Sequence, residues 1–306
     1  MTKPLKRPLD YQALLSHLET EHNLCVGGRA AAEQIISSVG YYRLSAYGLS
    51  LHVPNTNRFP DGASLLRLYR IYQFDAHFRH LLLSIVDTLE VSLRAKIANR
   101  FATNYGAEAH KNKANFVQIT NAFDEDLFDA LQRRLEVEIS KQRDMPFVKH
   151  HLTVYGGHFP VWVAIELYTI GMLRTQYSIM KQADKKAVAR LFSTKPVFLE
   201  TWIKSLANLR NICAHQGRLY FFPLRTSPKL YSEHAEHSNT TFVFHTVIML
   251  ACMLGESAEW YHFVNDLYLL IEDYQYDIDL RCIGFPPEWK GILLSAAKRE
   301  KNPASR

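Results

Sequence analysis

The sequence predicts an all-α protein built as a bundle of long helices. Residues 64–105 carry apolar side chains every three or four positions and contain no glycine or proline before Gly106. Two further helical patterns begin at Pro160 and Pro196, where a proline loses no needed hydrogen bond. No segment shows the alternation typical of a half-buried strand. With 306 residues, 47% of them hydrophobic, the chain is long enough to bury a sizeable core.

The helical patterns follow one another along the chain with short connections. We expect helices over 10–21, 30–39, 64–105, 124–142, 160–180, 196–216, 241–254 and 257–274. Gly217 is the expected stop signal of the sixth. Short loops favour antiparallel neighbours, so the proposed core consists of the helices 64–105, 160–180, 196–216 and 257–274.

A turn-rich segment suggests where the chain divides. Residues 52–62 contain Pro54, Asn55, Pro60 and Gly62, which predict a loop or a small hairpin. We therefore expect an N-terminal helical extension over residues 1–62 and a helical domain over residues 63–306.

Composition narrows the class of protein. The four cysteines form no Cys-x-x-Cys pair and no secretory signal is recognised, so we expect a cytoplasmic protein without disulfides or a zinc knuckle. The apolar run 242–254 is too short for the roughly 20 residues of a membrane span, so it is interpreted as a buried helix. The net charge of +6 favours a polyanionic partner.

Residues 210–215, Arg-Asn-Ile-Cys-Ala-His, combine a permanent cation, an amide and an imidazole within about two helical turns. Between Glu200 and Glu233 there is no acidic residue, and the positive charges of this window are Lys204, Arg210, Arg218, Arg225 and Lys229. The motif therefore lies in a basic stretch, which suits binding to a phosphate backbone.

These residue types can cleave RNA without a metal. The reaction needs a base for the 2′-hydroxyl proton, an acid for the leaving 5′-oxygen and cations for the charged phosphorane. His215 is the candidate proton carrier, Arg210 the candidate phosphate ligand and Asn211 the group that orients His215. One histidine does not serve as acid and base at once, so the chemistry predicts a homodimer that pools two copies of the site. An arginine and a histidine near a helix end also pair commonly with terminal carbonyls, which is the structural alternative.

Two glutamates outside the motif have structural interpretations that are simpler than a role in catalysis. Glu90 and Arg94 lie four apart and are expected to form an ion pair on one helix. Glu166 interrupts an apolar helix, so it either reaches solvent or faces Arg210.

Histidines and tyrosines outside the motif are also ambiguous. The histidines lack companion ligands at metal-binding spacing and are expected to be ordinary surface or core residues, namely His77, His80, His150, His151 and His158. The tyrosines at 41, 42 and 47 either close the core or stack RNA bases beside Arg43. Lys204, Arg218 and Arg43 are the candidate RNA-binding cations, and no metal or cofactor is expected.

The motif resembles the Arg-Asn-x-x-x-His signature of HEPN ribonucleases, and its flanks resemble those of Abi-like abortive-infection proteins. The similarity extends over about residues 30 to 220 in four ordered boxes, which are 39–47, 74–94, 160–173 and 206–219. This resemblance implies an all-helical HEPN fold and metal-independent endoribonuclease activity at a composite dimeric site formed by Arg210 and His215, with Asn211 in support. It further implies a role in defence against phage, in which RNA is cut and growth stops.

The resemblance also bears on partners and control. Some Abi-like proteins are linked to a small noncoding RNA, so a regulatory RNA is a conceivable partner beside the RNA substrate. HEPN toxins controlled by nucleotidylation carry a tyrosine two residues after the histidine, whereas this chain has Gly217 there. That form of control is therefore not expected. The alternative function is a non-catalytic RNA-binding or sensor module, in which the same cations hold phosphates.

Overall fold

The computed structural model describes residues 5, 7–239 and 241–298, and in these residues the fold is helical and forms no β-strand. The α-helices are α1 (Tyr11–Thr20), α2 (Arg29–Val39), α3 (Tyr41–Gly48), α4 (Leu65–Tyr105), α5 (Leu127–Lys141), α6 (Pro146–Val154), α7 (Val161–Ala164), α8 (Ile170–Ile179), α9 (Gln182–Arg190), α10 (Pro196–Ala214), α11 (Phe244–Leu254), α12 (Ala258–Tyr274) and α13 (Trp289–Ala297). Short 3₁₀ turns are η1 (Ala109–Lys111), η2 (Lys113–Asn115), η3 (Ile165–Leu167), η4 (Ser232–Asn239) and η5 (Leu280–Ile283). The all-α prediction is confirmed.

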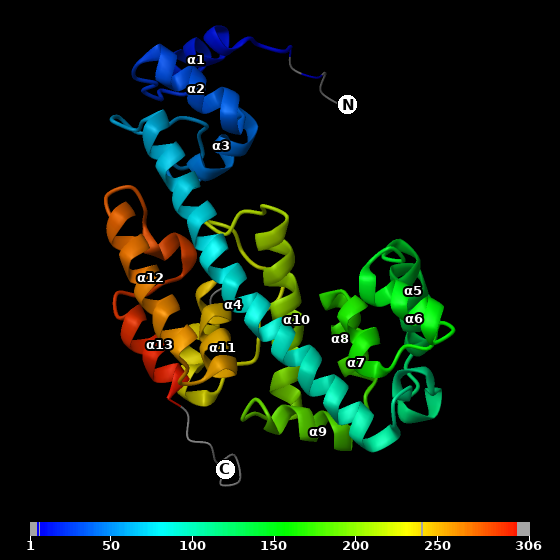
Figure 1. The fold of residues 1–306 in the computed structure, drawn as a ribbon. Helices are drawn as coiled ribbons and strands as arrows, with labels where there is room; N and C mark the ends of the chain where they lie inside the picture. Colours follow the sequence, from blue (N-terminus) through cyan, green and yellow to red (C-terminus); the bar gives the residue numbers. More distant parts are fainter. Residues whose placement is uncertain (1–4, 6, 240, 299–306) are drawn as a thin grey trace.

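The helix α4 is the axis of the molecule (Figure 1). It begins where the side chain of Ser64 accepts a hydrogen bond from the N–H of Arg67, and it ends at Gly106, whose φ of 88° suits a glycine. The predicted helix 64–105 is thus confirmed together with its stop signal. In Figure 1, α1–α3 gather around its first turns, α5–α9 lie around its last turns, and α10 and α12 flank its length.

The main core surrounds α4 and includes α11, whose residues are all buried except Leu254. Burial of each large aliphatic or aromatic side chain contributes about 1.5–3 kcal/mol, which explains why so apolar a helix lies inside the bundle. The interpretation of 242–254 as a buried helix is confirmed. None of the described helices combines the length and the apolar character that a bilayer span requires.

A second, smaller core belongs to the N-terminal unit, which comprises α1, α2, α3 and the loop that leads to α4. Its buried side chains include Leu15, Ile36, Leu44 and Phe59, and they pack on the first turn of α4 at Leu68. Residues 49–64 form the predicted loop, in which the N–H of residue 53 bonds to the carbonyl oxygen of residue 58 at 2.9 Å.

The predicted helix 160–180 is wrong as a single element. It is divided into α7, η3 and α8, with the break at Tyr168 and Thr169. The hydroxyl of Thr169 accepts a hydrogen bond from the N–H of Met172 and starts α8, and the Tyr168 carbonyl accepts one from Nη2 of Arg94 at 2.6 Å. A long-range contact therefore satisfies a backbone group that a continuous helix would have used.

The remaining differences concern short helices. The chain forms α6, α9 and α13 where no helix was predicted, and the aromatic box 41–48 forms α3. Each contains about two or three turns, so its hydrophobic period is too short to be distinguished from an irregular segment.

Candidate functional site

The motif 210–215 lies at the C-terminal end of α10. The helix begins with Pro196 at its first turn and ends at Ala214, so His215 is the residue that caps it. Beyond the cap, the N–H of Gly217 bonds to the Ile212 carbonyl at 2.7 Å and the N–H of Gln216 bonds to the Cys213 carbonyl at 3.3 Å. These two bonds form a Schellman motif. His215 is therefore held at a fixed point on the helix end.

The glycine after the motif acts differently from the prediction. The residue with left-handed backbone is Gln216, with φ of 55°, and the helix ends two residues earlier than expected. At Gly217 a Cβ atom would lie only 3.0 Å from Cγ2 and 3.2 Å from the carbonyl oxygen of Ile212. Gly217 thus packs closely against the last turn of α10, which leaves little room for a side chain.

The motif presents two polar side chains to solvent, and Cys213 and the residue before the motif face the core. Leu209 and Cys213 are buried, whereas Asn211 and His215, four residues apart, are both exposed. Among the described residues, no side-chain hydrogen bond involves either of these two. Burial raises the pKa of the Cys213 thiol to about 12, so this cysteine is a core residue and carries no reactive thiolate.

Arg210 faces a buried carboxylate of α4. Its Nε atom lies 3.9 Å from Oε2 of Glu90, and the side chain of Arg210 is 37% exposed. The other carboxylate oxygen of Glu90 pairs with Arg94, as the spacing of four residues predicted. Glu166 reaches solvent on η3, so the first of its two interpretations is confirmed. Glu90 is therefore the carboxylate at the site, and Arg210 is oriented by a charge that α4 supplies.

The turn after the motif is fastened to α3. Nη1 of Arg43 donates to the Gln216 carbonyl at 2.9 Å, and the guanidinium of Arg218 donates to the Ala46 carbonyl. The Arg218 guanidinium also lies 5.9 Å from the centroid of the Tyr47 ring. These contacts join two stretches that are distant in the sequence, and each uses one of the five N–H donors of its arginine. Their predicted contact with RNA stays a prediction.

A buried aspartate anchors the same turn to α4. Asp75 is fully buried and accepts hydrogen bonds from the N–H groups of Leu219 and Tyr220 at 3.0 and 2.8 Å. It also accepts from the hydroxyl of Tyr47 at 2.8 Å and from Nε of Arg79 at 3.2 Å. Sequence reasoning did not identify this role. The available signal was an aspartate on the apolar stripe of α4, where an unpaired charge would be costly.

Lys204 lies on α10 before the motif and is exposed. Eleven residues separate it from His215, which corresponds to about 16 Å along a helix. Lys204 therefore belongs to the same element as the motif and lies about three helical turns before His215.

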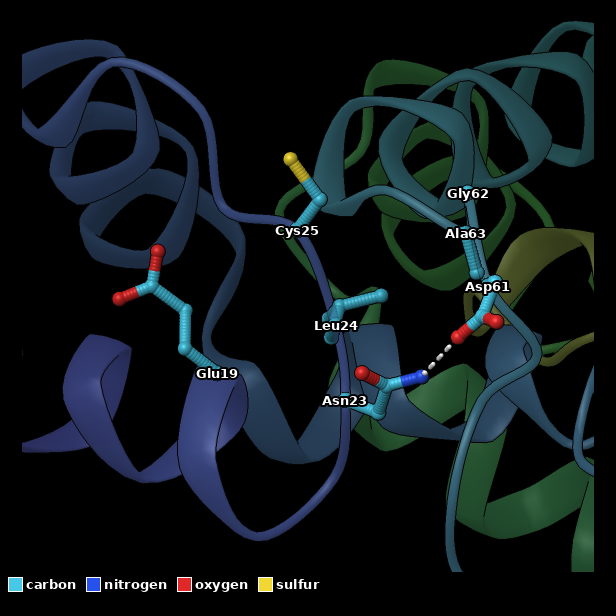
Figure 2. Close-up of a pocket in the computed structure, with 7 residues that line it drawn as sticks. All are labelled: Glu19, Asn23, Leu24, Cys25, Asp61, Gly62 and Ala63. Carbon is cyan, nitrogen blue, oxygen red and sulfur yellow. Dashed lines mark hydrogen bonds between the residues drawn. The ribbon is translucent and has the colours of Figure 1, made fainter.

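A hollow near the N-terminus lies away from the motif. Figure 2 shows it between residues 19–25 and residues 61–63, with a volume of about 260 Å³. Nδ2 of Asn23 donates to Oδ1 of Asp61 at 3.0 Å across it, and Glu19 supplies a second carboxylate. None of the predicted site residues lines this hollow, and its two carboxylates would repel a polyanion.

The histidines outside the motif have ordinary surroundings. His77 and His80 are exposed on α4, and the Nδ1 atom of His77 lies 3.2 Å from the Tyr274 hydroxyl. His158 pairs with Glu108 at 3.0 Å. In the described part of the chain, no group of three or more His, Cys, Asp and Glu side chains is arranged to hold a metal ion.

Comparison with known proteins places these elements in a family. A model of the family described as Abi-like protein matches residues 34–221, from within α2 to the turn that Asp75 anchors. No curated protein and no solved structure matches this chain. The matched segment covers more than half of the 306 residues and includes the motif on α10, Asp75 and Glu90 on α4, and the aromatic box on α3. The chain thus belongs to the family of Abi-like proteins.

Proposed function

We propose that this protein is a metal-independent HEPN-type endoribonuclease that acts in abortive infection from the cytoplasm. The observation that carries the proposal is the end of α10, where an exposed imidazole at 215 and an exposed amide at 211 lie beside a half-exposed guanidinium at 210. These groups match the requirements for cutting RNA through its own 2′-hydroxyl.

In the proposed reaction, His215 takes the proton of the 2′-hydroxyl, whose oxygen attacks the adjacent phosphorus. A histidine from the second copy gives a proton to the leaving 5′-oxygen, and Arg210 stabilises the charge on the phosphorane oxygens. The P–O5′ bond breaks as the P–O2′ bond forms, which leaves a 2′,3′-cyclic phosphate and a 5′-hydroxyl end. Asn211 supports the imidazole from one helical turn away.

The homodimer is part of the proposal. One chain supplies one motif histidine, and the exposure of residues 211 and 215 leaves room for a second copy to cover them. Specific activity per chain is then expected to fall on dilution as the dimer dissociates. Full turnover by a protein that sediments as a monomer would contradict this part.

The test compares the wild type with Arg210→Ala and His215→Ala in buffer that contains EDTA. We expect both variants to lose about 10²–10⁴-fold in cleavage rate and to relieve growth arrest in bacteria. The matched controls Arg134→Ala and His262→Ala, which change exposed residues on α5 and α12, are expected to cleave like the wild type. The 5′-hydroxyl product is identified by labelling with a polynucleotide kinase, which adds phosphate to this end without prior dephosphorylation. Equal cleavage by all five proteins would remove the proposal.

The alternative function is RNA binding without cleavage, as a sensor module that also binds a regulatory RNA. The pairing of Arg210 with Glu90 favours it, because a neutralised guanidinium is a weaker stabiliser of the phosphorane. Such a protein would bind RNA with a steep dependence on salt and would release no product.

A further inference from the structure

A pocket lies between α8 and α10, and α10 is also the helix that carries the motif. Its volume is about 250 Å³. This is below the roughly 300–1,000 Å³ of sites that enclose a whole drug-sized ligand, so it suits one part of a longer molecule. The side chains of Leu127, Tyr177 and Ile203 line it with apolar surface, and Arg174 and Lys204 are two cations at its exposed rim.

The charge of the rim is positive. Among the described residues, neither Arg174 nor Lys204 forms an ion pair. The carboxylate that lines the pocket, Glu200, lies 3.5 Å from Nζ of Lys185, so its charge is offset from outside the pocket. Two unpaired cations above an apolar floor are the arrangement that holds a phosphate beside a base.

The pocket and the motif are aligned. With 3.6 residues per turn, positions 211 and 215 each lie within about 20° of position 204 around the helix axis, and the residues at all three positions are exposed. About 16 Å separates position 204 from position 215 along the axis, which is the span of a few nucleotides of a single strand. A strand laid along this face would reach the pocket and His215 together.

We propose that the pocket between α8 and α10 binds a nucleotide of the substrate RNA, a few positions away from the bond that His215 cleaves, with Arg174 and Lys204 as its phosphate ligands. This inference rests on the proposed function, since it takes the strand at His215 to be RNA. It adds a subsite that gives the enzyme a minimum substrate length.

The test measures binding of a labelled single-stranded RNA of about twelve nucleotides in the His215→Ala background, over a range of salt concentrations. Each phosphate contact contributes about 0.7 to the slope of log K against log salt for a single strand. We therefore expect Arg174→Gln with Lys204→Gln to lower that slope by about 1.4 and to weaken binding. The matched control Lys149→Gln, an exposed lysine on α6, is expected to leave both unchanged. A dinucleotide, too short to span both the pocket and the motif, is expected to bind the His215→Ala protein more weakly than the twelve-nucleotide RNA does.

The outcomes separate this inference from the proposed function. If the wild type cleaves RNA but the double variant binds like the Lys149→Gln control, the subsite is wrong and the nuclease proposal stands. If no protein cleaves RNA but the double variant has the smaller slope, the binding site stands and the catalytic proposal is wrong. If no protein binds RNA, the subsite is refuted. Circular dichroism melting of each variant verifies that the exposed substitutions leave the fold intact.

Discussion

The Nε atom of Arg210 lies 3.9 Å from Oε2 of Glu90, so the arginine of the motif on α10 faces a carboxylate of α4. Glu90 is buried and holds Arg94 with its other oxygen, and Arg94 in turn holds the Tyr168 carbonyl at the start of α8. Glu90 thus pairs α4 with α10, and Arg94 extends the connection to the segment that leads into α8.

The first prediction concerns Glu90→Gln. The change removes the negative charge between two guanidinium groups, so we expect the free energy of unfolding to fall by about 1–3 kcal/mol. We also expect cleavage to fall further than the unfolded fraction explains, because Arg210 loses its orienting partner. Urea denaturation and cleavage assays measure the two effects. Glu136→Gln, an exposed glutamate on α5, is the control, and equal behaviour of the two variants would contradict the prediction.

The second prediction concerns Asp75→Asn. The amide N–H₂ group would replace one of the two carboxylate oxygens. One oxygen accepts from Tyr47 and Arg79, and the other accepts from the backbone N–H groups of Leu219 and Tyr220. A donor would therefore face other donors at either position. Because the buried guanidinium of Arg79 also loses its counter-charge, we expect a loss of about 3–5 kcal/mol in the free energy of unfolding.

Chemical denaturation measures this loss, and Asp87→Asn tests the same substitution at an exposed position of α4. That control is expected to change stability by no more than about 0.5 kcal/mol. A stable Asp75→Asn protein would show that the turn after the motif is held by other contacts.

The third prediction concerns pH. Burial, with a smaller contribution from Lys111, lowers the pKa of His110 from 6.5 to about 4. The unfolded state then binds a proton more readily than the folded state, so the stability from this group is present above pH 6.5 and is lost as the pH falls toward 4. The expected slope from this group is about 1.4 kcal/mol per pH unit.

His110→Leu removes the titrating group. Between pH 6.5 and about pH 4, the free energy of unfolding of this variant is therefore expected to fall less than that of the wild type. Denaturation curves at several pH values give the difference in free energy of unfolding between the two proteins. The contributions of the other titrating groups cancel in this difference. His262→Leu changes an exposed histidine and is expected to retain the wild-type slope. Parallel curves for His110→Leu and the wild type would show that His110 does not titrate differently on unfolding.

The fourth prediction compares two glycines. At Gly217 an added methyl group would press on Ile212, so Gly217→Ala is expected to cost about 1–3 kcal/mol and to displace His215. At Gly291, within α13, a Cβ atom would meet nothing within 4 Å, so Gly291→Ala is expected to stabilise by about 0.5–1 kcal/mol. Thermal melts of the two variants should therefore shift in opposite directions. A shift in the same direction would mean that the turn after α10 yields to the added group.

Features that depend on neighbouring residues could be predicted from the order of the amino acids alone. The span of α4 from Ser64 to Gly106 follows from a hydrophobic period and two end signals, and the polar motif on α10 is visible as a string of adjacent letters. The pairing of Glu90 with Arg94 also follows from a spacing of four. In each case the physical cause acts within a few turns of helix, so the local pattern contains it.

Which distant residues meet became apparent only from the packed fold. The contacts of Asp75 with Tyr220, of Arg43 with Gln216 and of Glu90 with Arg210 join segments that no periodicity relates. The break of the predicted helix 160–180 has the same origin, because a carbonyl at the break is satisfied by α4. Helix packing selects such partners through the shape and burial of whole surfaces, and that information is absent from any single stretch of the chain.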